Sequence, residues 1–272
     1  PSATLTKSGP VTYVVTYTGA DAVTLANPDV TLTKTGTANG TVVVNGSGNT
    51  VRTVTTSGIT GSGTLGISIA AGTASDNAGN ISTATGPSTT FTVDNTVPVT
   101  TIGDKPAVIT NATTANFNFT ANEAATFQCQ IDSGVFSTCV SPQTYTGLTE
   151  GSHFFSVKAT DKAGNTELLP PSHTWTIDIT KPVVGVSYSG GLYTNAGTIT
   201  LTLSGTDSSG LAGMMFSWDG GASWGTEETY GTTKTWNLGS SDGLKTVYVK
   251  FKDTAGNWSD PYRYDLTLDT VP

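Results

Sequence analysis

The pentapeptide DKAGN at residues 161–165 has two near copies elsewhere in the 272-residue chain, DNAGN at residues 76–80 and DTAGN at residues 253–257. After each copy, a segment of alternating apolar and polar residues ends in an Asp, and a Pro follows within four residues. The closing aspartates are Asp94, Asp178 and Asp269. Successive closing aspartates are 84 residues (94 to 178) and 91 residues (178 to 269) apart. These spacings are too long for solenoid units and fit small autonomous sandwiches. We therefore predict three domains: repeat 1 (residues 1–95), repeat 2 (96–179) and repeat 3 (180–272).

Each repeat contains short runs of alternating apolar and polar residues, separated by clusters of Gly, Asn, Asp or Ser. This pattern is typical of a β-sandwich. In repeat 1 it predicts seven strands, the number of a constant-type immunoglobulin sandwich: 3–7, 11–18, 30–34, 41–45, 51–56, 64–70 and 88–94. The corresponding strands B, F and G are predicted at 115–120, 153–160 and 173–178 in repeat 2, and at 199–203, 246–252 and 262–269 in repeat 3.

The composition agrees with an all-β fold. Only 12% of the residues are charged, Thr makes up about a fifth of the chain, and 32 Gly and 12 Pro supply turns. Such residues favour strands and turns over helices. The net charge of −8 has the wrong sign for binding nucleic acid, and no apolar run is long enough to span a bilayer. If the protein is exported, we expect this chain to be a mature or internal segment, because the first 20 residues lack the pattern of a signal peptide.

The two cysteines, Cys129 and Cys139, flank a turn centred on Gly134. A hairpin there would place them opposite each other, and a cross-strand disulfide would indicate an oxidising compartment, although two reduced thiols would also fit the sequence. His153 and His173 begin strands F and G and are expected to be surface residues. No catalytic constellation is evident, so we expect no enzymatic activity.

The repeated DxAGN turn, the closing strand that ends in Asp and the linker Pro together resemble tandem bacterial immunoglobulin-like repeats of large secreted adhesins. The resemblance covers essentially the whole chain and implies three β-sandwiches in an extended rod. It also implies an extracellular location at the bacterial cell surface, adjacent repeats of the same polypeptide as partners, and calcium at the joints.

The path of an immunoglobulin-type chain predicts which acidic residues meet at those joints. The chain enters a sandwich at the end that carries the B–C and F–G loops and leaves at the opposite end. The closing Asp of one repeat should therefore lie beside those two loops of the next. The expected clusters are Asp94, Glu123 and Asp161 at the first joint, and Asp178, Asp207 and Asp253 at the second.

Three carboxylates in one place repel each other unless a cation compensates, and Ca²⁺ accepts six to eight oxygen ligands. Two other interpretations stay open at this point. The aspartates of the DxAGN turns could only accept turn N–H groups, or Lys105, Lys162 and Lys181 could neutralise the joints.

Repeat 3 carries two further features. The stretch SWDGGASW at residues 217–224 matches an Asp-box, a structural turn motif, and four of the five tryptophans lie in this repeat. A coplanar, exposed pair of tryptophans could stack on sugar rings.

The favoured function is a non-enzymatic stalk or spacer of an extracellular adhesin or surface fibre. The alternatives are a carbohydrate- or protein-binding module centred on repeat 3, and a subunit of a self-assembling filament whose edge strands pair between copies.

Overall fold

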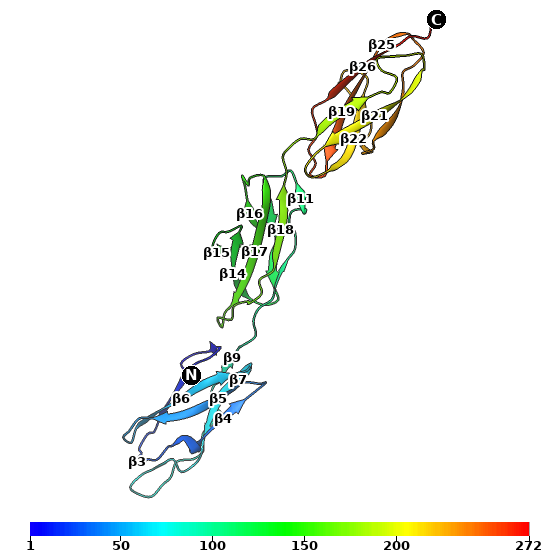
Figure 1. Cartoon of the computed structure of the whole chain (residues 1–272). Coiled ribbons are helices and arrows are strands. Elements are labelled where there is room, and N and C mark those ends of the chain that lie inside the picture. The colour runs from blue at the N-terminus through cyan, green and yellow to red at the C-terminus, as the bar shows by residue number, and fades with distance from the viewer. Residues whose placement is uncertain (272) are drawn as a thin grey trace.

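The computed structural model describes residues 1–271, which form an elongated molecule of three β-sandwiches in a row (Figure 1). The only helical segment in this range is the short 3-10 turn η1 (Asn27–Asp29). Within the described residues, no helix has the length and apolar character needed to cross a membrane. The prediction of an all-β fold is confirmed.

Repeat 1 has a four-stranded sheet in the order β1-β9-β7-β4 and a three-stranded sheet in the order β2-β6-β5, with the small pair β3-β8 at one end. The strands are β1 (Leu5–Thr6), β2 (Val11–Thr16), β3 (Ala22–Val23), β4 (Val30–Lys34), β5 (Asn39–Asn45), β6 (Val51–Thr60), β7 (Gly63–Ile69), β8 (Ala74–Ser75) and β9 (Phe91–Val93). All seven predicted strands are present. β6 continues four residues beyond its predicted end because a register shift in β5 between Asn39 and Thr41 lets the pairing resume.

Repeat 2 has a five-stranded sheet in the order β11-β18-β17-β14-β15, faced by the pairs β10-β13 and β12-β16. Its strands are β10 (Thr100–Ile102), β11 (Ile109–Thr110), β12 (Ala115–Phe117), β13 (Phe119–Ala121), β14 (Ala125–Ile131), β15 (Ser137–Cys139), β16 (Gln143–Tyr145), β17 (Gly151–Asp161) and β18 (Ser172–Ile177).

Repeat 3 has a five-stranded sheet in the order β20-β26-β25-β22-β23 and a three-stranded sheet in the order β19-β21-β24. Its strands are β19 (Val183–Ser187), β20 (Tyr193–Thr194), β21 (Thr198–Thr206), β22 (Leu211–Ser217), β23 (Glu228–Thr229), β24 (Thr233–Asn237), β25 (Gly243–Asp253) and β26 (Tyr262–Leu268).

In each repeat a two-residue strand from the first part of the repeat pairs with the last strand. The short strands β1, β11 and β20 run parallel to β9, β18 and β26, respectively. This pairing extends to the closing aspartates, because the backbone N–H groups of Asp94, Asp178 and Asp269 each donate to the carbonyl of the last residue of the short strand. Each closing aspartate is therefore held at the exit end of its sandwich by its own repeat.

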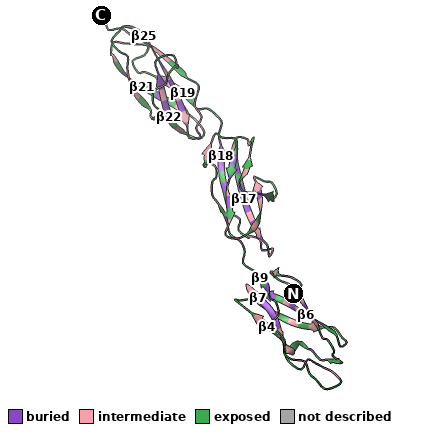
Figure 2. Ribbon diagram, turned by 180° about the vertical axis from the view of Figure 1, so that it is seen from behind, coloured by how far each residue is buried: buried purple, intermediate pink, exposed green. Residues whose placement is uncertain are grey.

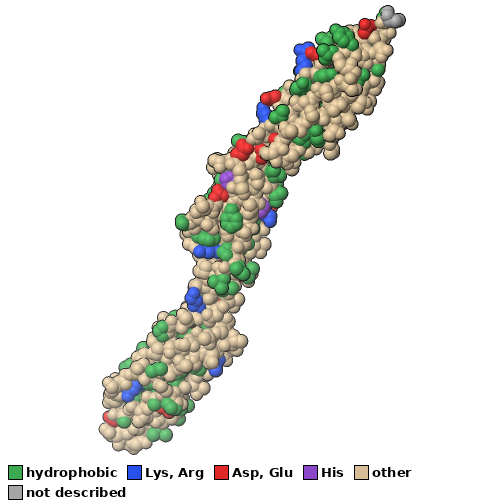
Figure 3. Space-filling model, viewed as in Figure 1, with side chains coloured by type: hydrophobic (Ala, Val, Ile, Leu, Met, Phe, Trp, Pro, Cys, Tyr) green, Lys and Arg blue, Asp and Glu red, His purple; other side chains and the backbone are tan. Residues whose placement is uncertain are grey.

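Each repeat has a separate hydrophobic core between its two sheets, seen as purple strand segments in Figure 2. The core of repeat 2 is the most aromatic. Phe117 stacks on Phe155 with ring centroids 3.9 Å apart, and Trp175 meets Phe117 edge to face at 5.3 Å. Alternation along the strands places these side chains on the inner face and leaves threonines outside. Most of the visible surface in Figure 3 is accordingly neither charged nor hydrophobic.

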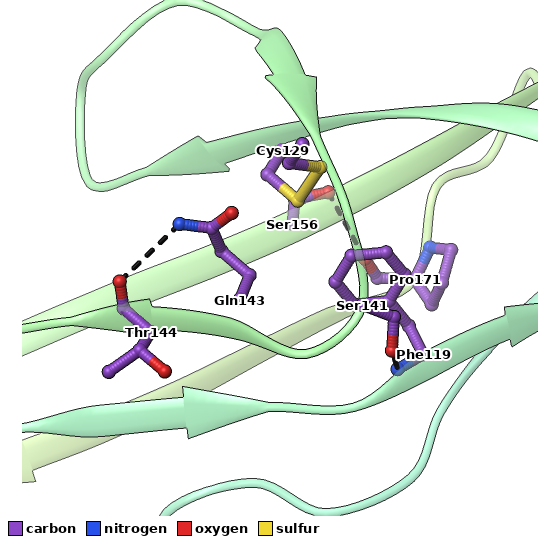
Figure 4. Close-up of a disulfide and its surroundings, with 8 residues drawn as sticks. Phe119, Cys129, Ser141, Gln143, Thr144, Ser156 and Pro171 are labelled. Atoms are coloured by element: carbon purple, nitrogen blue, oxygen red, sulfur yellow. Dashed lines mark hydrogen bonds between the residues drawn. A yellow bond between two sulfur atoms is a disulfide. The ribbon is translucent and has the colours of Figure 1, made fainter.

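The structure contains the disulfide between Cys129 and Cys139, which joins β14 to the end of β15 (Figure 4). We predicted that the two cysteines would lie directly opposite each other, and this register is wrong. Cys129 pairs with Ser137, and Cys139 pairs with Phe127. The hairpin is centred on residue 133, where Asp132 adopts a left-handed conformation with φ 49°. The bridge is therefore diagonal, between residues two positions apart on one face of the hairpin.

The prediction that the two histidines lie on the surface is wrong. His153 and His173 are 6% and 9% exposed, and both lie close to Trp175, at ring-centroid distances of 5.4 and 6.0 Å. The Nε2–H group of His173 donates to the Pro106 carbonyl at 2.9 Å. Strand alternation turns both rings toward the aromatic core, a placement that two isolated histidines in a sequence do not reveal.

Candidate metal centres between the repeats

The structure brings together both acidic clusters expected from the sequence. Carboxylate oxygens of Asp94, Glu123 and Asp161 lie within 4.8 Å of one another at the first joint. Asp178, Asp207 and Asp253 form an equivalent group at the second joint. In each group the first residue follows the last strand of one repeat, the second comes from a loop of the next, and the third ends a strand of that next repeat. Acidic side chains are visible at the junction of repeats 2 and 3 in Figure 3.

The DxAGN turn holds the buried aspartate of each cluster. Asp161 ends β17, and its Oδ1 accepts the backbone N–H of Asn165 at 2.8 Å while its Oδ2 accepts the side-chain amide of Asn165 at 2.8 Å. Gly164 takes a positive φ of 87°, which closes the turn. Asp253 and Asn257 reproduce this arrangement at the second joint. The aspartates of these turns therefore do accept turn N–H groups. The carboxylates of Asp161 and Asp253 still keep lone pairs for another partner, because each carboxylate has about four acceptor sites.

The closing aspartates reach the joints from the preceding repeat. Oδ1 of Asp94 accepts the N–H of Thr96, and Oδ1 of Asp178 accepts the N–H of Thr180, both at 3.0 Å. Asp178 is only 4% exposed, and its Oδ2 is buried with no hydrogen-bond partner among the described residues. A buried carboxylate oxygen without a partner is costly, so this atom is suited to accept a cation or a hydrogen-bond donor.

The electrostatics of the first joint are those of crowded carboxylates. Partial burial, together with repulsion by Asp94 and Asp161, raises the pKa of Glu123. Burial acts in the same direction on Asp161, but hydrogen bonds from Asn165 and the turn N–H groups outweigh it and lower the pKa of that carboxyl. Asp161 is thus held as an anion by its turn, while the charge on Glu123 is opposed by its neighbours.

The lysines near the joints do not neutralise the clusters. Lys181 pairs with Asp260 at 2.6 Å, and within residues 1–271 no ion pair joins Lys105 or Lys162 to a cluster carboxylate. The same five ion pairs leave all six cluster residues without a basic partner. Of the interpretations that the sequence left open, neutralisation by lysine is therefore not seen in the described structure.

Direct contacts between repeats also occur at both joints, and sequence reasoning missed them. The side-chain amide of Asn165 donates to the Asp94 carbonyl at 2.9 Å, and that of Asn257 donates to the Asp178 carbonyl at 2.7 Å. Beside them, Lys7 Nζ donates to the Gly164 carbonyl at 2.5 Å in the first joint. In the second joint the Asn111 N–H donates to the Ala255 carbonyl at 3.0 Å. The sequence feature that could have indicated these contacts is the Asn that ends all three copies of the pentapeptide.

Repeat 1 contains a similar turn without the third carboxylate. Asp76 accepts from Asn80 through both carboxylate oxygens, and Asp21 accepts the N–H of Asn77 at 2.8 Å. No closing aspartate reaches these residues within the described chain, and they do not belong to a three-residue cluster there. This turn is an internal reference for the joints, since it has the capping bonds alone.

The donor set of each joint consists of carboxylate oxygens. Such hard oxygen ligands suit Ca²⁺, whose coordination is flexible, whereas zinc sites use His and Cys. Three carboxylates fill only part of a calcium shell, and backbone carbonyls and water commonly supply the rest. The residues present therefore fit a calcium ion.

No protein-family model matches the chain, and no curated protein matches it. Three solved structures with similar architecture are all built of consecutive modules. The fibronectin(III)-like modules of Clostridium thermocellum CbhA are 17% identical with a TM-score of 0.41, covering 62% of this chain and 94% of theirs. A tetra-tandem repeat from the extending region of a large adhesion protein is 20% identical with a TM-score of 0.34, covering 97% and 75%. Domains FN1–FN3 of chicken CNTN1 are 11% identical with a TM-score of 0.39, covering 96% of each chain.

Proposed function

We propose that this chain is a stalk segment of an extracellular bacterial adhesin or surface fibre, in which calcium bound between repeats stiffens the rod. The observation that carries the proposal is the pair of carboxylate clusters, each built from two successive repeats with its oxygens within 4.8 Å. An ion bound there would join one repeat to the next and restrict bending at the linker.

The second joint provides the clearest energetic reason for an ion. At about 4.8 Å, two like charges repel by about 3 kcal/mol with an effective dielectric constant of about 20. Asp178 and Asp253 are 4% and 1% exposed, so water screens them poorly, and Asp178 Oδ2 has no hydrogen-bond partner among the described residues. A divalent cation would satisfy this oxygen and offset the repulsion.

The fold suits a load-bearing spacer. The short strand near the start of each repeat runs parallel to the last strand, so tension on the chain loads this pair along its length and strains its hydrogen bonds together. The surface, rich in threonine and low in charge, presents few strong electrostatic sites to other molecules. The disulfide of repeat 2 fits an oxidising, extracellular setting.

Calcium titration of the metal-free chain by calorimetry tests the proposal, with two ions expected to bind. Glu123→Gln and Asp178→Asn should each remove one ion, because each neutralises one of the three carboxylates in one cluster while keeping the size of the side chain. Asp76→Asn is the matched control, since this turn has no cluster, and both ions should still bind. Absence of calcium binding to the unaltered chain, or two ions in both cluster variants, would refute the calcium joints.

A further inference from the structure

Trp218 is the one tryptophan of repeat 3 that internal packing does not explain. Trp224 and Trp258 flank Lys250, whose Nζ lies 4.3 and 4.8 Å from their ring centroids. Trp236 is half-buried against Phe216, with ring centroids 5.6 Å apart. Trp218 instead is 69% exposed, although burying an indole is strongly favourable.

The exposed indole stands at the rim of a pocket of about 260 Å³, called here the Trp218 pocket. The pocket lies where the end of β22 approaches β24 and the start of β25, and its lining residues are Trp218, Trp236, Asn237, Leu238, Leu244, Lys245 and Thr246. Its volume is just below the roughly 300 Å³ at which sites for drug-sized ligands begin. A single sugar-sized ring is therefore a better match than a larger ligand.

The Asp-box holds Trp218 in place. The Asp219 carboxylate accepts hydrogen bonds from the Ser217 hydroxyl at 2.6 Å and from the N–H and hydroxyl of Ser223. Ser217 in turn accepts the N–H of Gly221 at 3.1 Å. The backbone that presents Trp218 is thus fixed on both sides, which reduces the entropy lost when a ligand stacks on the ring.

The geometry of the two indoles selects one ring rather than a row of rings. Trp218 and Trp236 lie 6.0 Å apart and are tilted by 48°, so they do not form the coplanar platform considered from the sequence. A tilted pair makes a wedge in which the C–H face of one pyranose can pack on indole while its hydroxyl groups face polar side chains. Asn237 is such a residue in the lining, whereas the Thr246 hydroxyl already donates to Asp265 Oδ1 at 2.6 Å.

Lys245 adds a positive charge to the pocket in a chain of net charge −8. Its Nζ contacts the Ser241 hydroxyl at 3.1 Å, and no carboxylate within residues 1–271 forms an ion pair with it. We propose that the Trp218 pocket binds one pyranose unit of an acidic polysaccharide, with the ring on Trp218 and the sugar carboxylate at Lys245. This site would give the stalk an adhesive surface of its own, independent of calcium at the joints.

Titration of the full chain with trigalacturonic acid, followed through the indole N–H signals in NMR spectra, tests this site. A chelator in the buffer keeps metal effects at the joints out of the measurement. The Trp218 and Trp236 signals should shift saturably, with a dissociation constant on the order of 1 mM for one stacked ring. Trp218→Ala should abolish the saturable shift of Trp236, while Tyr193→Ala, which removes an exposed aromatic outside the pocket, should leave it unchanged.

The role of Lys245 is tested with the neutral sugar maltotriose and the variant Lys245→Gln. Both changes should weaken binding roughly fivefold, the effect expected of one partly exposed ion pair. Absence of a saturable shift with trigalacturonic acid, or its persistence in Trp218→Ala, would overturn the site. Equal binding of the neutral and the acidic trisaccharide would overturn the assignment to acidic sugars.

Discussion

At the scale of single residues, the terminal Asn of the DxAGN turn performs two tasks with one amide group. Asn257 donates one hydrogen bond to the Asp253 carboxylate in its own turn and another to the Asp178 carbonyl of the preceding repeat. Asn80 makes only the first of these contacts. The same short sequence is therefore a local cap in repeat 1 and a clasp between repeats elsewhere.

We expect Asn257→Ala to loosen the joint between repeats 2 and 3 because it removes the contact with the Asp178 carbonyl. Loss of the two side-chain bonds should cost about 1–3 kcal/mol. Energy transfer between dyes on repeats 2 and 3 should show a broader distance distribution in calcium-free buffer. Asn80→Ala loses the equivalent turn bond alone and should leave this distribution unchanged; equal broadening in both variants would contradict the clasp.

His153 is a second residue whose surroundings determine its chemistry. Its Nδ1 lies 3.0 Å from an Asp132 carboxylate oxygen and its Nε2 lies 2.8 Å from the Thr149 carbonyl, so both ring nitrogens face acceptors. Burial favours the neutral ring, but the hydrogen bonds to Thr149 and Asp132 and the charge of Asp132 outweigh it and raise the pKa of His153. The charged imidazolium, which has two donors, matches this site.

Repeat 2 should therefore lose stability as the pH rises. A histidine whose pKa is higher in the folded than in the unfolded state stabilises the fold below about 6.5, and this contribution disappears as the pH passes the folded-state pKa. Hydrogen exchange of β17 amides, corrected for the intrinsic rate and compared at about pH 6 and pH 9, should show weaker protection at the higher pH. His153→Gln should remove this pH dependence and His173→Gln should keep it; an unaltered profile in His153→Gln would exclude His153 as the cause.

At the scale of elements, three interactions hold the β14-β15 hairpin in place. The disulfide ties Cys129 to Cys139, Asp132 binds His153, and the N–H of Asp132 donates to the Phe154 carbonyl at 2.7 Å. On the neighbouring strand β17, the Ser156 hydroxyl donates to the Pro171 carbonyl at 3.1 Å (Figure 4). The edge strand β15 has only three residues, so these three interactions contribute more to the stability of the hairpin than the backbone hydrogen bonds of β15.

The double variant Cys129→Ser/Cys139→Ser should fold and be less stable. The cysteines are ten residues apart, and closing so short a loop contributes about 2–3 kcal/mol by reducing the entropy of the unfolded chain. Trp175 is the only tryptophan outside repeat 3, so denaturation of a chain that lacks the other four reports on repeat 2. The loss should match that caused by reductant in the parent chain; a change below about 0.5 kcal/mol would show that the hairpin does not depend on the bridge.

At the scale of the whole molecule, the two joints share a plan but differ in burial and in nearby charge. Asp178 and Asp253 are both buried at the second joint, whereas only Asp161 is buried at the first. Lys7 also places its ammonium group beside the turn of the first joint, where the second has the neutral backbone of Asn111. Because nearby positive charge opposes cation binding, the second joint should bind calcium more tightly.

Small-angle scattering with and without a chelator should detect the effect of the ions on shape. With calcium, we expect a single extended rod; without it, both linkers become hinges, so the mean dimension falls and the distribution widens. Intermediate calcium should stiffen the joint between repeats 2 and 3 first. Asp178→Asn should remove this first step and Glu123→Gln the later one, whereas identical scattering curves with and without calcium would contradict stiffening by the ion.

The sequence by itself determined the all-β class, the recurring turn and the strands, because alternation and turn residues act over a few neighbouring positions. It also indicated which acids would meet, since the path of the chain through a sandwich follows from strand order. The tertiary structure alone decided the burial of His153, the diagonal register of the disulfide and the second contact of Asn257. It also decided the exposure of Trp218, since each of these depends on how surfaces distant in sequence pack.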